Sequence, residues 1–184
     1  MHGSLTFMLI RRERSGDIEA IRAVAAAAFR GAEHSAPPVE PGGDPGEATL
    51  ISWLRDDAAW IPEFSLVAVE EDEIIGHVVA TRAHVDSSPA LGIGPVSVQP
   101  GQQGRGVGSA LMHAVLGAAD ARGETVVGLL GEPAYYARFG FVPASGTAVS
   151  SPESEWGDYF QIRTLSDYDG QGGTFQYAGP FDRF

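Results

Sequence analysis

The chain contains no cysteine and no lysine, so all 12 of its basic residues are arginine. The absence of cysteine excludes disulfide bonds, a catalytic thiol and cysteine-ligated zinc, and we expect no bound metal. The 24 acidic residues bring the net charge to −12. Phosphate contacts require positive charge, so we expect no nucleic-acid partner. The negative charge would steer a cationic substrate towards the protein, although solubility is the simpler explanation for it.

Long hydrophobic runs are also missing. No stretch reaches the ~20 apolar residues of a membrane-spanning helix, and we expect no membrane partner. Residues 1–10 lack the basic start and the small-residue cleavage site of a signal peptide, which favours a cytoplasmic location. Met8 is an alternative start, in which case residues 1–7 are a leader or the remnant of a tag. With 43% hydrophobic and 20% charged residues, the composition is typical of a globular chain.

Hydrophobic periodicity and turn residues predict one domain over residues 1–184, of mixed α+β class. Residues 7–144 would form its core, and residues 145–184 a C-terminal strand and tail whose last fifteen residues follow no clear pattern. The long helix would cross over between two strands of one sheet. The predicted strands are 7–12, 64–70, 74–86, 91–98, 124–130, 141–144 and 159–165, and the predicted helices are 15–31, 47–57, 106–122 and 132–140.

Four glycines, Gly101, Gly104, Gly106 and Gly108, lie just before and at the start of the long helix. A P-loop is excluded because it requires lysine. The dinucleotide-binding fingerprint is excluded because its spacing differs and because the segment follows a hairpin. The remaining pattern, Gln-x-x-Gly-x-Gly, is met by residues 103–108 (QGRGVG). The free amides at a helix start can bind a pyrophosphate if no side chain blocks them. The alternative is a structural turn, which would cost stability needlessly.

This motif follows VSVQP at 96–100 and precedes YYARFGF at 135–141. Together they resemble the GCN5-related N-acetyltransferase (GNAT) superfamily over about residues 7–144. GPVSV and PAYYARFGF further resemble a bacterial branch of predicted N-acetyltransferases with a P-x-Y-Y-x-R-F-G-F motif. The resemblance implies a central, mostly antiparallel mixed sheet with helices on both faces (αβα). It also implies a splay between the strands at 92–99 and 125–130, and acetyl-CoA as co-substrate.

Cofactor-binding residues are implied by the same resemblance. The backbone of the strand before the loop would pair with the pantetheine arm, and the glycine loop would cradle the pyrophosphate. Arg105 would add charge near a phosphate. The residues so implied are Val96, Ser97, Val98, Gln103, Gly104, Arg105, Gly106, Val107, Gly108 and Ser109.

Pro95 interrupts the strand at 91–98, since proline cannot donate to a ladder. A bulge there would splay this strand from its neighbour and open a slot for the thioester, where a backbone amide could hold the developing oxyanion. The alternative is a plain edge strand.

Acetyl transfer needs a proton for the departing thiolate, which a nearby hydroxyl can supply. Tyr136 stands four residues before Gly140, where the Y-x-x-x-G-F pattern of the family has its general acid. The alternative is an ordinary packing tyrosine, which is the role we expect for Tyr135.

The base that deprotonates the amine is less clearly indicated. His84 is the candidate if its strand pairs so that His84 lies near Ile93, on the acceptor side of the slot. Glu33, His34 and Glu132 are rivals, and a solvated or structural histidine is the alternative.

Two departures from the family pattern concern the chemistry. Leu129 occupies a position where many members carry an asparagine that bonds the cofactor, and the strand at 92–98 contains no acidic residue, where some members keep their base.

The implied function is acetyl transfer from acetyl-CoA to a primary amine, which we expect to belong to a small molecule, by direct attack on the thioester. The acidic charge favours a cationic amine. The alternatives are acetylation of a protein N-terminus or lysine, and a non-catalytic acyl-CoA-binding protein. The tail would line the acceptor site through Trp156, Tyr159 and Phe160, which are equally compatible with a core. Whether the chain forms a homodimer is left open.

Overall fold

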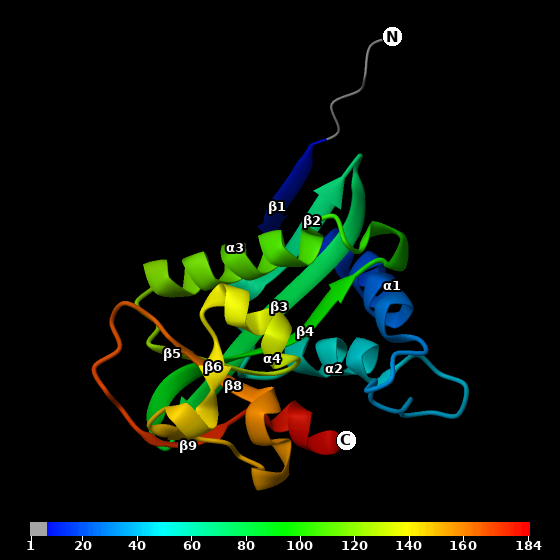
Figure 1. Cartoon of the computed structure of the whole chain (residues 1–184). Coiled ribbons are helices and arrows are strands. Elements are labelled where there is room, and N and C mark those ends of the chain that lie inside the picture. The colour runs from blue at the N-terminus through cyan, green and yellow to red at the C-terminus, as the bar shows by residue number, and fades with distance from the viewer. Residues whose placement is uncertain (1–6) are drawn as a thin grey trace.

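The structure, a computed structural model, describes residues 7–184 (Figure 1). Residues 1–6 are outside the described residues, and with them most of the predicted leader. The strands occur at β1 (Met8–Arg12), β2 (Ser65–Glu70), β3 (Glu73–Val85), β4 (Ser88–Val98), β5 (Val126–Leu130), β6 (Val142–Pro143), β7 (Val149–Ser150), β8 (Phe160–Thr164) and β9 (Gly173–Gln176). The α-helices are α1 (Ile18–Phe29), α2 (Gly46–Arg55), α3 (Val107–Ala121) and α4 (Pro133–Tyr136).

The sheet runs in the order β1-β2-β3-β4-β5-β8-β6. Every neighbouring pair in this series is antiparallel except β4 and β5, which are parallel and joined by α3 as the crossover. The expected mixed, mostly antiparallel sheet is therefore confirmed. The tail adds β9, which the sequence pattern did not predict and which pairs with the end of β3.

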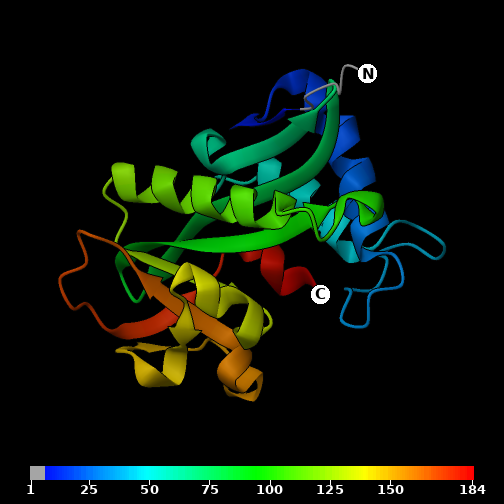
Figure 2. The ribbon, with the colours of Figure 1, turned by 45° about the horizontal axis from the view of Figure 1, so that its top comes forward.

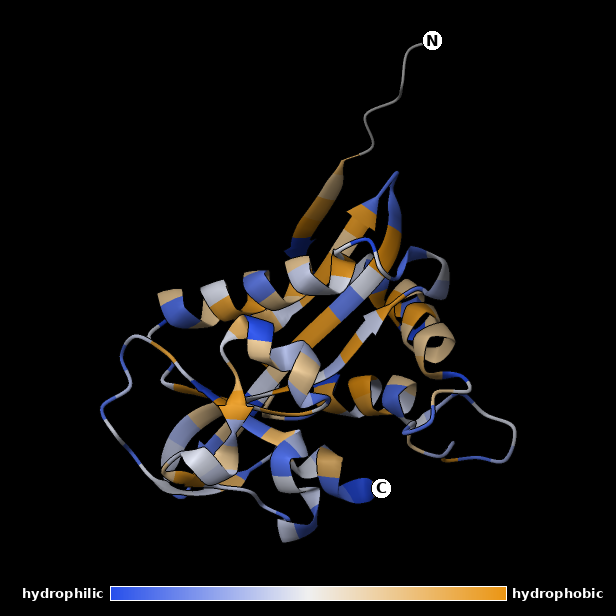
Figure 3. Cartoon of the chain, viewed as in Figure 1, coloured by the Kyte–Doolittle hydropathy of each residue, from blue (hydrophilic) through white to orange (hydrophobic). Residues whose placement is uncertain are grey.

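Helices cover both faces of the sheet, as expected (Figures 1 and 2). Helix α3 lies across one face of β2, β3 and β4, and α1 and α2 lie against the opposite face. Hydrophobic residues line the strands beneath α3, whereas the outer loops are largely hydrophilic (Figure 3).

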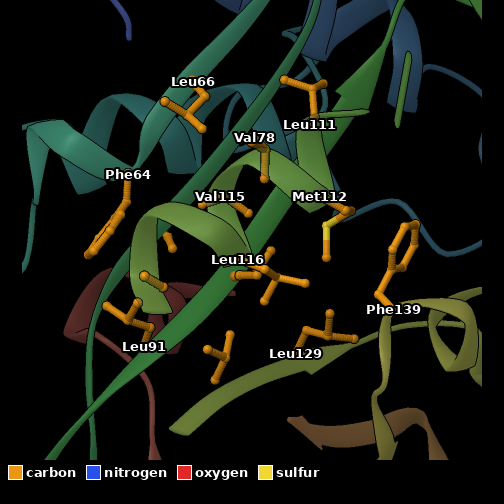
Figure 4. Packing of buried hydrophobic residues seen from close by; sticks show 14 of the residues in the cluster. Phe64, Leu66, Val78, Leu91, Leu111, Met112, Val115, Leu116, Leu129 and Phe139 are labelled. Atoms are coloured by element: carbon orange, nitrogen blue, oxygen red, sulfur yellow. The ribbon is translucent and has the colours of Figure 1, made fainter. Parts of the chain in front are cut away.

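The larger core lies between α3 and the sheet. Helix α3 buries Leu111, Met112, Val115 and Leu116, which recur at helical spacing and so form one face. These side chains pack against residues from β2, β3, β4 and β5, including Leu91 (Figure 4). This core includes residues from β2, β3 and β4 on one side of the β4–β5 boundary and from β5 on the other. It therefore fixes the start of α3 relative to β4 and β5.

A polar network is buried beneath α2. Glu13 accepts hydrogen bonds from Arg55 at 2.7 and 3.1 Å and from Ser65 Oγ at 2.5 Å. Ser65 Oγ also lies 2.9 Å from Nε2 of His77, which is completely buried. Burial alone would raise the pKa of Glu13, but His77, Arg55 and Ser65 outweigh it and lower that pKa to about 2. Burial lowers the pKa of His77, so the imidazole is neutral.

The network predicts that Glu13→Gln destabilises the fold. The substitution removes the charge that balances Arg55, and breaking a buried ion pair costs about 3 kcal/mol. We expect urea unfolding at neutral pH to show that loss, whereas the exposed Glu19→Gln should change stability by less than about 0.5 kcal/mol. Equal stability of the two variants would show that the network contributes nothing.

The same network predicts acid sensitivity. The pKa of Glu13 is about 2 in the folded chain against 4.5 for the ordinary group. The ionised carboxylate therefore stabilises the fold above pH 4.5, and this contribution disappears as the pH falls towards 2. The stability difference between the natural protein and Glu13→Gln should shrink over that window, and a constant difference would contradict the assignment.

Candidate active site

The site begins where β4 and β5 separate. Their ladder holds only two register pairs, Leu91 with Val127 and Gly92 with Gly128, although both strands continue further. A parallel pair that ends so early leaves a gap between the strands, so the expected splay is confirmed.

A bulge in β4 accompanies this separation. Ala80 of β3 pairs with Ile93, but Val78, two residues away, pairs with Val96. The extra residue of β4 therefore lies at the Gly94–Pro95 step, where the sequence predicted a bulge. Beyond it, the β5-facing edge of β4 has no strand partner among residues 7–184.

The bulge also sets the side-chain directions of the strand end. Ser97 pairs with His77 and is buried towards α1 and α2. Val96 and Val98 alternate with it and pack on the α3 side. The backbone of these three residues consequently runs along the open edge, where an extended ligand chain can pair with it.

The glycine loop delivers the chain to the start of α3. Gly104 and Gly106 have φ values of +75° and +84°, in the left-handed region that glycine adopts readily. Ala110 N donates to Gly106 O at 2.9 Å as the first intrahelical bond. The amides of Val107, Gly108 and Ser109 therefore have no partner within the helix. Together with the positive end of the helix dipole, they form a site suited to a pyrophosphate.

Side chains fix the loop in place. Gln103 Nε2 donates to Val98 O at 3.2 Å, which ties the loop to the end of β4. Arg105 pairs with Glu70 at 3.0 and 3.1 Å and also hydrogen-bonds Gln102. The charge that the sequence suggested for a phosphate is thus partly balanced by Glu70, which raises the pKa of Arg105.

Tyr136 ends the short helix α4 on the α3 side of the sheet. A Cβ on Gly131 would lie 2.3 Å from Cε2 of Tyr136, so only glycine leaves room for the ring. Burial, followed by the neighbouring Tyr135, raises the pKa of Tyr136 to about 12. Its hydroxyl is therefore protonated at neutral pH and able to donate.

The predicted placement of His84 was wrong. His84 pairs with Pro89 and Gln176, at the far end of the β3–β4 hairpin, and its side chain is exposed. Ile93 pairs with Ala80 instead. The hairpin turns at residues 86–87, earlier than the sequence pattern suggested, so the geometric argument for His84 as the base does not hold.

The rival bases lie at the surface. Glu33 and His34 are exposed in the segment after α1, and Glu132 caps α4 through Ala134 N at 3.5 Å.

The C-terminal tail supplies a residue that the sequence did not indicate. Tyr177, immediately after β9, lies against Gly92: a Cβ there would be 2.7 Å from Cδ1 of the ring. Phe175 covers Gly128 in the same way, also at 2.7 Å. The last β4–β5 pair is thus formed by two glycines under two aromatic rings, a feature that only the β9 pairing reveals.

The three tail aromatics considered from sequence differ in their surroundings. Phe160 is fully buried, Trp156 is half-buried and lies 6.2 Å from the Tyr177 ring, and Tyr159 is 53% exposed. Trp156 alone combines exposure with contact to the splayed region.

Within residues 7–184, no cluster of His, Asp or Glu side chains is suited to hold a metal ion. None of the helices described in that range combines the length and apolar character needed to cross a bilayer.

Comparison with known families agrees with this geometry. The family model described as an acetyltransferase (GNAT) domain matches residues 9–144. The chain belongs to the GNAT family of N-acetyltransferases and is an acyltransferase.

Relatives and solved structures extend the match. The chain is 36% identical over 104 residues to the uncharacterised N-acetyltransferase YjhQ of Escherichia coli K12, an alignment that covers 54% of this chain and 58% of that protein. The match thus spans less than two thirds of YjhQ. It is 29% identical over 143 residues to YhbS of the same strain, covering 75% and 84%.

Two crystal structures are similar over nearly the whole chain. A GNAT family acetyltransferase from Brucella melitensis, solved with acetyl-CoA, is 31% identical with a TM-score of 0.76 and covers 96% of this chain and 99% of its own. YhbS from Escherichia coli, solved with CoA, is 26% identical with a TM-score of 0.85 and covers 100% and 97%.

Two glycines of the α3 region should respond to alanine in opposite directions. Gly106→Ala places a side chain at φ +84°, which costs roughly 1–2 kcal/mol. Gly117→Ala lies within α3 with nothing near its Cβ, and should stabilise by up to about 1 kcal/mol. Chemical denaturation measures both changes, and a stabilising Gly106→Ala would refute the left-handed start of α3.

Proposed function

We propose that the protein transfers the acetyl group of acetyl-CoA to a primary amine of a small molecule by direct attack of the amine on the thioester. The observation that carries the proposal is the gap between β4 and β5 beside a glycine loop that opens α3. Residues 1–184 would form one acetyltransferase domain, with residues 7–144 as its core and residues 145–184 lining the acceptor side.

The loop and the strand edge suit the two halves of coenzyme A. The unpaired amides at the start of α3 suit the pyrophosphate, and the free edge of β4 suits the pantetheine arm, which carries amides of its own. The residues assigned to these contacts are Val96, Ser97, Val98, Gln103, Gly104, Arg105, Gly106, Val107, Gly108 and Ser109. Support comes from the two similar structures, which were solved with acetyl-CoA and CoA.

The chain would then contribute to three events. The neutral amine nitrogen forms a bond to the thioester carbon while a β4 amide near the bulge stabilises the oxyanion. The carbon–sulfur bond breaks, and the thiolate takes the proton of Tyr136, which solvent later returns. The proton lost by the amine passes to solvent, since no side chain holds an assigned role as its base.

One observation favours a small acceptor over a protein. Residues 173–184 close over the α1/α2 face: Phe181 lies 3.9 Å from the Cβ position of Gly94, and the Phe184 ring packs against Trp53 with 5.3 Å between ring centroids. The net charge of −12 favours a cationic amine, which a small molecule and a protein lysine both supply.

Substitution of the assigned acid tests whether Tyr136 takes part in the chemistry. Tyr136→Phe should lower kcat about 100-fold because the thiolate loses its proton donor. The dissociation constant of acetyl-CoA, measured by calorimetry, should stay within about twofold, which corresponds to about 0.4 kcal/mol of binding free energy. An unchanged kcat, measured by thiol release, would show that Tyr136 takes no part in the chemistry.

A matched control comes from the tail. Tyr168→Phe deletes a hydroxyl that already donates to Gln171 O at 2.8 Å, and it should leave kcat unchanged. Because the pKa of Tyr136 is raised to about 12, the activity that depends on its proton should persist through the neutral and mildly alkaline range.

A further inference from the structure

Five buried side-chain atoms have no hydrogen-bond partner among residues 7–184, and four of them lie around the β4 bulge. Buried polar atoms nearly always have a hydrogen-bond partner. A group of exceptions in one place therefore indicates either a ligand that supplies the missing partner or local strain in the fold. The four atoms are His77 Nδ1, Thr81 Oγ1, Ser97 Oγ and Tyr177 Oη.

These atoms lie on one face of the sheet. His77 pairs with Ser97 and Thr81 pairs with Gly92, and residues paired across a ladder share a face. His77 also pairs with Val67, which packs against α1, so the shared face is the one that α1, α2 and the tail cover. Tyr177 joins it because its ring rests on Gly92.

Tyr177 lies against the last residue of β4 that pairs with β5. A Cβ on Gly92 would lie 2.7 Å from Cδ1 and 2.9 Å from Cε1, so the side of the ring formed by these two carbons lies against β4. Gly92 belongs to the last β4–β5 pair. The ring therefore lies over the residue at which the two strands part.

The two tyrosines of the region approach the gap from opposite faces. Tyr136 packs in the core beneath α3, and Tyr177 packs with Ala83 and Phe175 on the other face. Burial, with a contribution from the nearby Tyr136, raises the pKa of Tyr177, so its hydroxyl is neutral. Coenzyme A, bound through the start of α3, would occupy the Tyr136 side, which leaves the Tyr177 side to the acceptor.

We propose that Tyr177 Oη accepts a hydrogen bond from the nitrogen of the acceptor amine and so directs the nitrogen lone pair at the thioester carbon. This inference rests on the proposed function. A neutral phenol can accept such a bond from a neutral primary amine, which keeps its lone pair for attack. It makes Tyr177 an acceptor-binding residue supplied by the tail, and it explains why the hydroxyl has no partner within the protein.

The test is Tyr177→Phe, which keeps the ring on Gly92 and removes only the hydroxyl. No protein hydrogen bond is lost, so thermal unfolding should be unchanged or slightly improved. With putrescine, 2-phenylethylamine and lysine methyl ester as acceptors, we expect kcat/KM for the best amine to fall about tenfold, the value of one hydrogen bond. The KM and the calorimetric dissociation constant of acetyl-CoA should not move.

Controls separate the outcomes. Tyr168→Phe removes a tail hydroxyl that has a protein partner, and it should keep full kcat/KM. Natural protein that acetylates an amine while Tyr177→Phe matches it overturns this inference alone. Natural protein that binds no acetyl-CoA, or that acetylates none of the three amines, overturns the proposed function and this inference with it. A drop in acetyl-CoA affinity in Tyr177→Phe would place the hydroxyl on the cofactor and refute the assignment.

Discussion

The contact between two glycines, Gly92 of β4 and Gly128 of β5, is the constraint on which the rest of the site depends. Parallel strands normally continue side by side, but here the ladder ends at this pair. Each glycine is covered by an aromatic ring at a distance that no Cβ tolerates. The absence of side chains at these two glycines therefore lets the rings of Phe175 and Tyr177 pack directly on the last pair, which holds the tail against the sheet.

Everything on the cofactor side follows from that separation. Because β4 bulges at Gly94–Pro95, its end turns away from β5 and presents an unpaired backbone edge. The glycine loop then places the first amides of α3 next to this edge. The buried face of α3 packs against β4 and β5 alike, and so holds the two strands in place on either side of the gap. A strand edge and a helix start, set at one corner, suit a long ligand with an amide-bearing arm and a pyrophosphate.

Local sequence patterns were sufficient for this half of the molecule. The glycine motif, Pro95 and the P-x-Y-Y-x-R-F-G-F segment indicated the loop, the bulge and Tyr136 because each depends on neighbours close in the chain. His84 was misplaced because hairpin register depends on where the turn falls, and Asp86, with φ of +49°, places it earlier than expected. Tyr177 could not be found because β9 pairs with β3 some ninety residues away.

The most direct test is a crystal structure of the protein with acetyl-CoA. The pyrophosphate should lie on the amides of residues 104–109, the pantetheine should pair with β4 at residues 96–98, and the acetyl group should lie between Tyr136 and Tyr177. Acetyl-CoA bound away from the β4–β5 gap, or with its acetyl group turned out of it, would contradict the role assigned to the Gly92–Gly128 separation.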